Sequence, residues 1–427
     1  MKTITIVGLG YVGLPVACLC AEKGNKVYGL DVDKNKIELI NKSQSPIDDK
    51  YLISKLKNLK NGISATADPA ECIPNSDAII ICVPTPVDRN NSPDLTALME
   101  SVSAVSKFIR QGTLLIVEST IYPGTIEEIA VPILKKQKFD AYKNDIFVAH
   151  CPERIDPGNK KWTVENLPRV VGGVTKEAAK KAAEFYRSII DAEVVELSSV
   201  KAAEATKIME NTFRDVNIAF VNEMAQSFDR AGIDVLEVIK GASTKPFAFM
   251  PHYPGAGVGG HCISIDPYYL IEKAKQLGFH HKFLLLAREI NNNMPHYTIE
   301  LLENEMRKLK KTIKGAKVGV LGLAYKANVD DTRESPAFEI INILKTKGAD
   351  IFVFDPHVGK GSNAKDLNEL LNKSDYIILA TDHIEFKNMD LSLLKKNKIL
   401  AVIDGRNCLD KEKIKTMGIL YHGIGRG

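Results

Sequence analysis

The chain has 427 residues, of which 44% are apolar and 26% are charged, with a formal net charge of +4. This composition suits a globular protein with a sizeable core, and the length indicates two or three domains. The small net charge and the lack of a dense Lys/Arg run argue against binding to nucleic acid or to an anionic membrane, and the apolar runs are too short to cross a bilayer.

The N-terminal residues and the cysteines indicate a reducing compartment. The chain enters a strand pattern at once, without the apolar stretch and cleavage site of a secretory signal. Its seven cysteines are odd in number and irregularly spaced, which does not suit a disulfide framework. We therefore expect a cytoplasmic protein.

The first third alternates strand-like and helix-like segments. Apolar runs of strand length lie at residues 3–10, 26–33, 77–86, 113–120 and 145–153. Helical patterns separate them, for example at residues 14–24 and 94–109. This alternation predicts a parallel sheet with helices on both faces.

A glycine motif follows the first predicted strand. Gly8, Gly10 and Gly13 have the G-x-G-x-x-G spacing, in which the glycines permit a tight turn, close approach of a pyrophosphate and close helix packing. Asp31 ends the next strand, where a carboxylate would bind ribose hydroxyls. This predicts NAD rather than NADP, a preference that the nearby Lys36 softens. The alternative is a glycine turn with a surface aspartate.

Four more residues complete the expected cofactor site. Tyr11 and Val12 lie inside the glycine motif, at the start of the helix whose N-terminus would face the phosphates. Thr85 and Thr120 follow later strands, and ligands bind at the carboxyl ends of strands in such sheets. Ordinary turn threonines are the alternative for these two positions.

A long helix is expected from about Val200 to Ala231, because this stretch has no Gly or Pro and is followed by Gly232. Lys207, Asn211 and Arg214 share one face of it. A lysine and an amide on one face can stabilise an oxyanion, although a solvated helix face is the simpler reading.

Two further segments carry candidate chemistry. Glu153 and Arg154 follow a predicted strand, where a carboxylate can act as a base. Cys262 follows the glycine-rich residues 254–260, and a thiol becomes nucleophilic when a cation or a helix start favours the thiolate. A small buried residue is the alternative for the cysteine.

Asp266 is expected to cap a helix that has Pro267 in its first turn and ends at Gly278. His261 is next to Cys262, and adjacent side chains usually point apart. We expect no metal site, because His261 and Cys262 alone make no zinc ligand set.

A second α/β unit is expected at the C-terminal end. Strand patterns return at residues 316–325, 349–356, 374–382 and 398–405. Ala324 stands where the last part of a glycine fingerprint would lie, so a second dinucleotide site is not expected.

These segments together resemble the UDP-glucose/GDP-mannose dehydrogenase family over essentially the whole chain. The resemblance is carried by the order and spacing of GLGYVGLP, VPTP, EST, PER, the K-x-x-x-N pair of the long helix, PGAGVGGHCISIDP and AYKANVDDTRESP. It implies an α/β fold of two Rossmann-like domains joined by a long central helix. The implied domains are an NAD-binding domain (1–199), a central dimerisation and cysteine region (200–302) and a UDP-sugar-binding domain (303–427).

The resemblance also implies the reaction. It is a four-electron, NAD-dependent oxidation of a sugar C6 hydroxymethyl group, in which Cys262 forms a thiohemiacetal and then a thioester. Lys207 and Asn211 would stabilise the oxyanions, and Glu153 and Asp266 would order or deprotonate water. The expected substrate contacts are Arg154, Arg214, Tyr253, Gly255, Gly259, Lys326, Arg333 and Arg406. The expected assembly is a homodimer formed through the central helix.

The sugar is expected to be an N-acetylhexosamine. UDP-glucose members typically carry PKD- or QKD-like and PEFLRE-like segments, and this chain has SID and PERIDPGN instead. The DPGN segment favours UDP-N-acetyl-D-glucosamine over UDP-N-acetyl-D-mannosamine, and Arg214 is a candidate contact to the acetamido region. UDP-glucose is a less favoured alternative. The product would serve polysaccharide or glycan synthesis.

Two readings outside this reaction stay open. A two-electron dehydrogenase of the hydroxyacid kind also joins a Rossmann domain to long helices but needs no cysteine. A nucleotide sensor without catalysis would keep the fold alone. The combination of Cys262, Lys207 and Asn211 argues against both.

Overall fold

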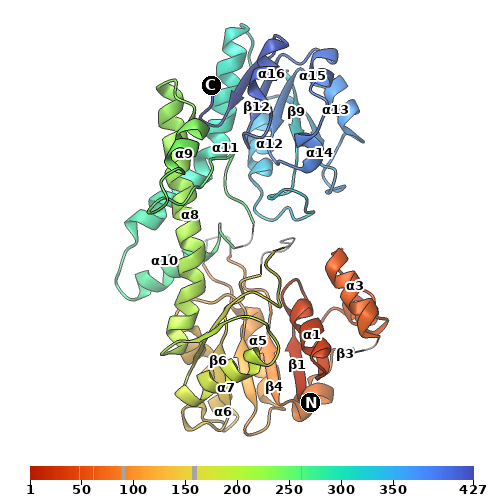
Figure 1. The fold of residues 1–427 in the computed structure, drawn as a ribbon, viewed down its shortest axis with the longest axis vertical. Helices are drawn as coiled ribbons and strands as arrows, with labels where there is room; N and C mark the ends of the chain where they lie inside the picture. Colours follow the sequence, from red (N-terminus) through yellow and green to blue (C-terminus); the bar gives the residue numbers. More distant parts are fainter. Residues whose placement is uncertain (48, 61, 89–91, 156–160, 261) are drawn as a thin grey trace. The chain divides into compact units, whose positions relative to one another are not determined.

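The computed structural model describes the whole chain except residues 48, 61, 89–91, 156–160 and 261 (Figure 1). The described residues form two compact units, each treated by itself below. The first comprises Met1–Glu210 with Tyr268–Phe279, and the second comprises Asn211–Pro267 with His280–Gly427. No helix in the described ranges combines the length and the apolar character that crossing a membrane requires.

The first unit is built on an eight-stranded sheet with the order β3-β2-β1-β4-β5-β6-β7-β8. Its strands are β1 (Thr3–Val7), β2 (Lys26–Leu30), β3 (Ile63–Thr66), β4 (Ala78–Ile81), β5 (Leu114–Val117), β6 (Phe147–His150), β7 (Arg169–Gly173) and β8 (Val194–Glu196). Neighbouring strands are parallel except β6 and β7, which pair antiparallel. The expected parallel sheet is therefore present, with one reversal that the apolar pattern did not indicate.

Helices lie between these strands. They are α1 (Gly13–Glu22), α2 (Lys34–Asn41), α3 (Lys50–Leu59), α4 (Pro69–Cys72), α5 (Thr96–Ser106), α6 (Val131–Lys136) and α7 (Lys176–Arg187), with short turns η1 (Ile73–Asn75), η2 (Ile126–Ala130) and η3 (Ala141–Lys143). The N-terminus of α7 is capped by Thr175, whose hydroxyl accepts a hydrogen bond from the Ala178 amide at 3.1 Å.

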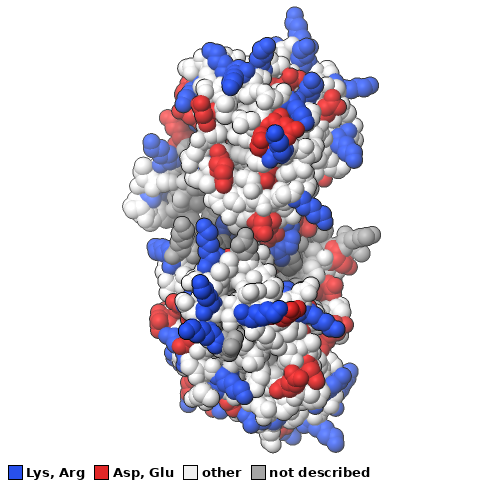
Figure 2. Space-filling view, turned by 90° about the vertical axis from the view of Figure 1, so that its right-hand side faces the viewer, with Lys and Arg blue, Asp and Glu red and all other residues white. Residues whose placement is uncertain are grey.

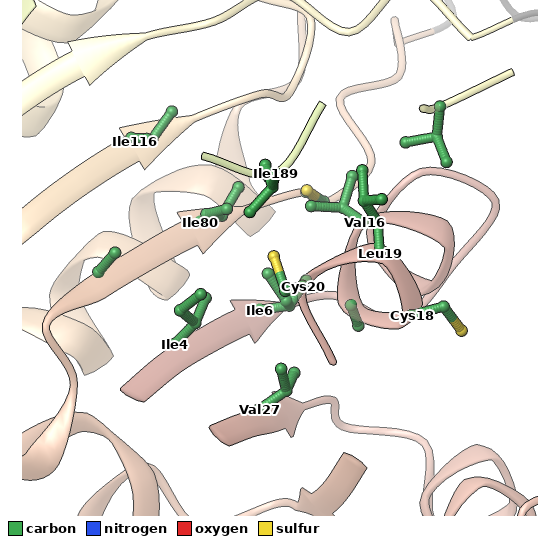
Figure 3. Close-up of a cluster of buried hydrophobic side chains, with 14 of the residues drawn as sticks. Ile4, Ile6, Val16, Cys18, Leu19, Cys20, Val27, Ile80, Ile116 and Ile189 are labelled. Carbon is green, nitrogen blue, oxygen red and sulfur yellow. The ribbon is translucent and has the colours of Figure 1, made fainter. Parts of the chain in front are cut away.

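The core of the first unit fills the space between β1, β4 and α1. Figure 3 shows the side chains of Ile4 and Ile6 facing those of α1, with the Cys18 and Cys20 thiols in the same cluster. Strand β4 is buried along its whole length, as expected for a central strand covered on both faces. This packing places the carboxyl ends of the central strands at one edge of the sheet.

Four helices follow, of which the first and the last are long: α8 (Val200–Arg230), α9 (Val235–Ala242), α10 (Asp266–Gln276) and α11 (Lys282–Lys308). Helix α8 matches the expected uninterrupted helix, and Gly232 after it has a φ of 70°. Both α8 and α10 contribute residues to the two units.

The second unit contains a five-stranded parallel sheet with the order β10-β9-β11-β12-β13. Its strands are β9 (Lys317–Leu321), β10 (Asp350–Phe354), β11 (Tyr376–Leu379), β12 (Ala401–Asp404) and β13 (Leu420–Gly423), and its further helices are α12 (Pro336–Thr346), α13 (Leu367–Lys373), α14 (Ile384–Lys387), α15 (Ser392–Lys396) and α16 (Lys411–Thr416). Separate apolar clusters pack on it. The fold class expected from the sequence is confirmed: two Rossmann-like sheets and a long central helix. On the face seen in Figure 2, acidic and basic side chains are intermixed.

Candidate active site

The turn between β1 and α1 meets the three demands of a dinucleotide motif. Gly8 has a φ of +91°, and a Cβ there would lie 2.6 Å from the Cys82 carbonyl oxygen. A Cβ on Gly13 would overlap the Gly8 carbonyl oxygen, so this glycine permits close helix packing. A Cβ on Gly10 would meet no heavy atom within 4 Å. Open space at Gly10 is what the approach of a pyrophosphate requires.

Asp31 supports the same turn. Its Oδ2 accepts a hydrogen bond from the Leu9 amide at 2.8 Å, and Lys36 Nζ lies 3.8 Å from that oxygen. Its Oδ1 accepts from the Asp33 amide at 2.9 Å. Within the motif, Tyr11 is 46% exposed, whereas Val12 is half-buried. The carboxylate is thus held beside the glycine turn, where it fits a dinucleotide ribose.

Thr85 and Thr120 lie past the ends of β4 and β5 and contact each other. The Thr85 hydroxyl donates to the Thr120 carbonyl oxygen at 2.7 Å. The Tyr269 hydroxyl donates to the Thr85 carbonyl oxygen at 2.5 Å, a contact that the sequence analysis missed. Tyr269 therefore positions the loop after β4.

Glu153 and Lys207 are brought together in the first unit. Lys207 Nζ lies 3.9 Å from Glu153 Oε2, and both side chains are buried. The Ile155 amide donates to Glu153 Oε1. Burial raises the pKa of Glu153 to about 7, against the opposing effect of Lys207. A carboxyl group that titrates there can exchange a proton at physiological pH.

Arg154 is held by the first unit itself. Its guanidinium lies 2.7 Å from Glu210 Oε1 and donates from Nη1 to the Pro168 carbonyl oxygen at 2.9 Å. A substrate contact through Arg154 would therefore have to share or displace these bonds.

Asn211 and Asp266 are brought together in the second unit. Asn211 Nδ2 donates to Asp266 Oδ2 at 2.5 Å, and both side chains are buried. Asp266 is the first residue of α10 rather than the cap before it, because its amide donates to the Cys262 carbonyl oxygen at 2.8 Å. The turn that starts at Cys262 thus leads directly into the helix.

Cys262 is the only exposed cysteine of the seven, all of which lie in the described ranges and none of which is in a disulfide. The other six are buried or half-buried. The alternative of a small buried residue therefore does not fit Cys262. His261 lies outside the described residues.

The glycines before Cys262 pack closely against another loop of the second unit. A Cβ on Gly259 would lie 2.7 Å from the Glu334 carbonyl oxygen, and one on Gly260 would lie 2.7 Å from Tyr325 Cε2. The family resemblance implies a substrate contact at Gly259, and the structure adds a packing requirement at both glycines. Tyr253, at the start of the loop, is 62% exposed.

The four candidate cations of the second unit differ in their surroundings. Arg406 donates from Nε to the Ala380 carbonyl oxygen at 2.9 Å, and a Cβ on Gly255 would lie 3.0 Å from its Nη1. The Arg333 guanidinium donates bidentate hydrogen bonds to the Asp331 carboxylate, and the shorter of them is 2.6 Å. Lys326 is half-buried and Arg214 is exposed on α8.

One group of side chains in the described ranges has the composition of a metal site: His357, His383 and Glu385. The Asn328 amide donates to His383 Nδ1 at 2.9 Å, which places the ring proton on Nε2. That nitrogen lies 3.0 Å from Asp355 Oδ2. Both ring nitrogens are therefore occupied by hydrogen bonds.

Comparison with known proteins matches three parts of the chain to domains of one family. Residues 2–190 match the NAD binding domain of the UDP-glucose/GDP-mannose dehydrogenase family, residues 201–293 its central domain and residues 319–411 its UDP binding domain.

Individual relatives match over nearly their full length. A UDP-N-acetyl-D-mannosamine dehydrogenase of Methanococcus maripaludis (strain C7) is 39% identical over 100% of this chain and 98% of its own. A UDP-N-acetyl-D-glucosamine 6-dehydrogenase of Pseudomonas aeruginosa is 37% identical over 96% of this chain and 98% of its own. The solved UDP-D-ManNAc dehydrogenase of Pyrococcus horikoshii superposes with a TM-score of 0.93 at 36% identity, covering 100% of this chain and 99% of that one. The chain therefore belongs to the UDP-glucose/GDP-mannose dehydrogenase family and is an NAD-dependent oxidoreductase.

Proposed function

We propose that this protein oxidises the C6 hydroxymethyl group of a UDP-N-acetylhexosamine to a carboxylate, through a covalent intermediate on Cys262. The observation that carries the proposal is the exposure of this one cysteine in the turn that leads into α10, while the six others are buried or half-buried. An exposed thiol next to a helix start has the surroundings that favour a nucleophilic thiolate.

The first step removes the hydroxyl proton from O6 and a hydride from C6 and leaves an aldehyde. NAD supplies the hydride acceptor for both oxidations. The Cys262 thiolate adds to the aldehyde and gives a thiohemiacetal, which loses a second hydride to become a thioester. Water then hydrolyses the thioester, releasing the uronic acid and restoring the thiol.

The polar groups have distinct roles in this scheme. Lys207 and the amide of Asn211 stabilise the negative oxygen that develops on C6 in each addition. Glu153 accepts the proton of the attacking water, since its pKa of about 7 lets it do so at physiological pH. Asp266 holds the Asn211 amide and is a second candidate to order water.

Binding of the two nucleotides is divided between the units in this proposal. In the first unit, the glycine turn with Tyr11 and Val12 holds the NAD phosphates, Asp31 and Lys36 face its ribose, and Thr85 and Thr120 lie near the nicotinamide end. The UDP-sugar is bound by Lys326, Arg333, Arg406, Tyr253, Gly255 and Gly259, with Arg154 and Arg214 as further contacts.

The configuration at C2 of the sugar distinguishes UDP-N-acetyl-D-glucosamine from UDP-N-acetyl-D-mannosamine. The DPGN segment favours glucosamine, but residues 156–159 lie outside the described residues. Relatives at 39% and 37% identity carry the mannosamine and glucosamine names, respectively. A substrate panel of both sugars and UDP-glucose, followed by NADH absorbance, tests this. NADH formation with either N-acetylhexosamine supports the proposal, and a preference for UDP-glucose would contradict it.

We also propose a cytoplasmic homodimer formed through α8. The exposed face of this helix carries Met209, Phe213 and Phe220, with exposures of 69%, 49% and 58%. Large apolar side chains repeated along one helix suit an interface. Light scattering after gel filtration tests this, and a monomer at micromolar concentration would contradict it. The reduced cysteines fit a cytoplasmic location.

A further inference from the structure

An arginine that the proposed reaction does not use, Arg169, is the first residue of β7 in the first unit and acts electrostatically on Glu153. Strands β6 and β7 pair antiparallel, with Ala149 opposite Gly173 and His150 opposite Gly172. Glu153 lies three residues past the end of β6 and Arg169 is the first residue of β7, so the same register, continued beyond the paired residues, brings the two level with each other. Their charges act on each other.

A second carboxylate belongs to the same face. Strand β5 pairs with β6 through Val117 and His150, so Glu118 lies beside the residue after His150. Helix α7 packs over this face and supplies Tyr186. The Tyr186 hydroxyl donates to Glu118 Oε1, and Arg169 Cζ lies 5.8 Å from the centroid of its ring.

These groups are almost completely removed from solvent. Arg169 is 1% exposed, Glu118 is 0% exposed and Glu153 is 9% exposed. Among the described residues, Nε and Nη1 of Arg169 have no hydrogen-bond partner. A buried guanidinium without full hydrogen bonding depends on nearby negative charge for its stability. The two carboxylates are balanced by two cations, Arg169 and Lys207.

We propose that Arg169 is a positioning residue for the reaction: its buried charge, set against Glu118, keeps Glu153 ionised beside Lys207. The inference rests on the role proposed for Glu153 as a base. Without Arg169, the carboxylates of Glu118 and Glu153 would face only one cation. Glu153 would then take up a proton and lose its capacity to accept one from water.

The titration behaviour of the cluster agrees with this charge balance. Burial raises the pKa of Glu153 to about 7, Lys207 and Arg169 oppose this rise, and Glu118 adds to it. The other titratable groups here stay uncharged near neutral pH. Burial raises the pKa values of Cys82, Cys151 and Tyr186 and lowers that of His150 to about 3. The balance therefore depends on two carboxylates and two cations.

The inference is tested by titrating Glu153 in proteins without substrate or NAD. Glutamate side chains are labelled with ¹³C at the carboxyl carbon, and the Glu153 signal is assigned by its loss in Glu153→Gln. Arg169→Met should raise the pKa of Glu153 on the order of one pH unit, and Glu118→Gln should lower it by a similar amount. The double variant restores the charge balance and should return the pKa close to the original value.

Arg169→Lys is the matched control, since it keeps the charge and should leave the pKa of Glu153 near its original value. Shifts in the same direction for Arg169→Met and Glu118→Gln would overturn the inference, as would no shift in either. If Arg169→Met does not fold, the other two variants still test the inference. An unchanged pKa of Glu153 in Glu118→Gln would overturn the inference, and so would a raised pKa of Glu153 in Arg169→Lys.

The same variants give a readout in turnover. The acid limb of the pH profile of kcat should move to higher pH in Arg169→Met and to lower pH in Glu118→Gln. Because the NMR titration needs no turnover, it separates the two ideas. A chain that oxidises no UDP-sugar refutes the proposed function, whereas a Glu153 pKa insensitive to Arg169 refutes this inference alone.

Discussion

Asn211 and Asp266 are joined by a 2.5 Å hydrogen bond that ties helix α8 to the first residue of α10. The same turn of chain contains Cys262, whose carbonyl oxygen accepts from the Asp266 amide at 2.8 Å. The bond therefore links the amide proposed to stabilise the oxyanion with the segment that holds the proposed nucleophile. It also orients the Asn211 amide, since the carboxylate accepts from the nitrogen and leaves the other amide hydrogen for a ligand.

Removing the Asn211 amide should impair both catalysis and stability. Asn211→Ala leaves the buried Asp266 carboxylate without this donor, which should cost about 1–3 kcal/mol of unfolding free energy. Loss of an oxyanion donor should lower kcat by roughly 10²–10³-fold. Urea unfolding and steady-state kinetics measure the two effects. Glu223→Ala, at an exposed position of the same helix, is the control and should change neither. An unchanged kcat in Asn211→Ala would exclude the amide from the oxyanion site.

The glycine loop should tolerate no side chain at Gly260. This residue has a φ of +84°, and an added Cβ would lie 2.7 Å from Tyr325. Gly112 has nearly the same φ, +83°, but an added Cβ there would meet nothing within 4 Å. Gly112→Ala should therefore cost about 1 kcal/mol from backbone strain alone, and Gly260→Ala about 3 kcal/mol because crowding adds to it.

Thermal or urea unfolding of the two glycine variants provides the comparison. Tyr325→Ala combined with Gly260→Ala should recover part of the loss, since it removes the crowding atoms. Equal costs at the two glycines would show that packing against Tyr325 contributes nothing.

Stability should fall as pH rises through the titration of His422. Its Nε2 lies 2.8 Å from Asp229 Oδ1, and its Nδ1 lies 2.9 Å from Glu305 Oε1. Burial opposes the charged ring, but the hydrogen bonds to these carboxylates outweigh it and raise the pKa of His422. A raised pKa in the folded state gives a stabilisation that is fully present below the unfolded value of about 6.5 and lost above the folded value.

The carboxylates set the lower limit of this window. Their hydrogen bonds to His422 lower the pKa values of Asp229 and Glu305 despite their burial. Their stabilisation is present above roughly pH 4.3 and lost as pH falls through the lowered values. The cluster should thus contribute most between roughly pH 4.3 and 6.5. The free energy of unfolding of the wild type, measured in urea, should fall by about 1–2 kcal/mol between pH ~6 and ~8.5.

His422→Gln should remove most of this slope of the unfolding free energy against pH. His296→Gln is the control, because His296 is exposed and should leave the slope intact. If the unfolding free energy of His422→Gln falls with pH as steeply as that of the wild type, His422 does not cause the pH dependence.

The charge of Asp31 should determine cofactor choice. Asp31→Asn keeps an oxygen for the Leu9 amide but removes the negative charge that repels a 2′-phosphate. The KM for NAD should rise about tenfold, and the ratio of kcat/KM with NAD to kcat/KM with NADP should fall by a similar factor. Initial rates with both cofactors measure this. If NADP stays as poorly used as before, another group excludes the phosphate.

The parts of the fold that the sequence predicted are those with strong local patterns. Strands β1, β4 and β5 and the central strands of the second sheet are nearly all buried, so each appears as a continuous apolar run. Strands β3, β8 and β13 lie at sheet edges and include polar residues or glycine, so no such run marks them. The long helix was readable because no Gly or Pro interrupts residues 200–230.

Only part of the candidate site could be predicted from the sequence, and the reason is physical. Motif spacing indicated that Gly8, Gly13 and Asp31 lie close together, because these residues interact within one local unit. The exposure of Cys262 and the burial of Arg169 depend on packing between distant segments. An arginine that begins a strand looks like a surface cation until the antiparallel pairing of β6 and β7 is known.

The central claim is that Cys262 captures the aldehyde so that the same carbon is oxidised twice. The most direct test counts NADH formed per UDP-N-acetylhexosamine consumed, in wild type and in Cys262→Ser, with Cys408→Ser as the matched control. Wild type and Cys408→Ser should give about two NADH per sugar. Cys262→Ser should lose turnover by about 10³-fold or more while it keeps its affinity for NAD. One NADH per sugar in wild type, or full activity in Cys262→Ser, would contradict the claim.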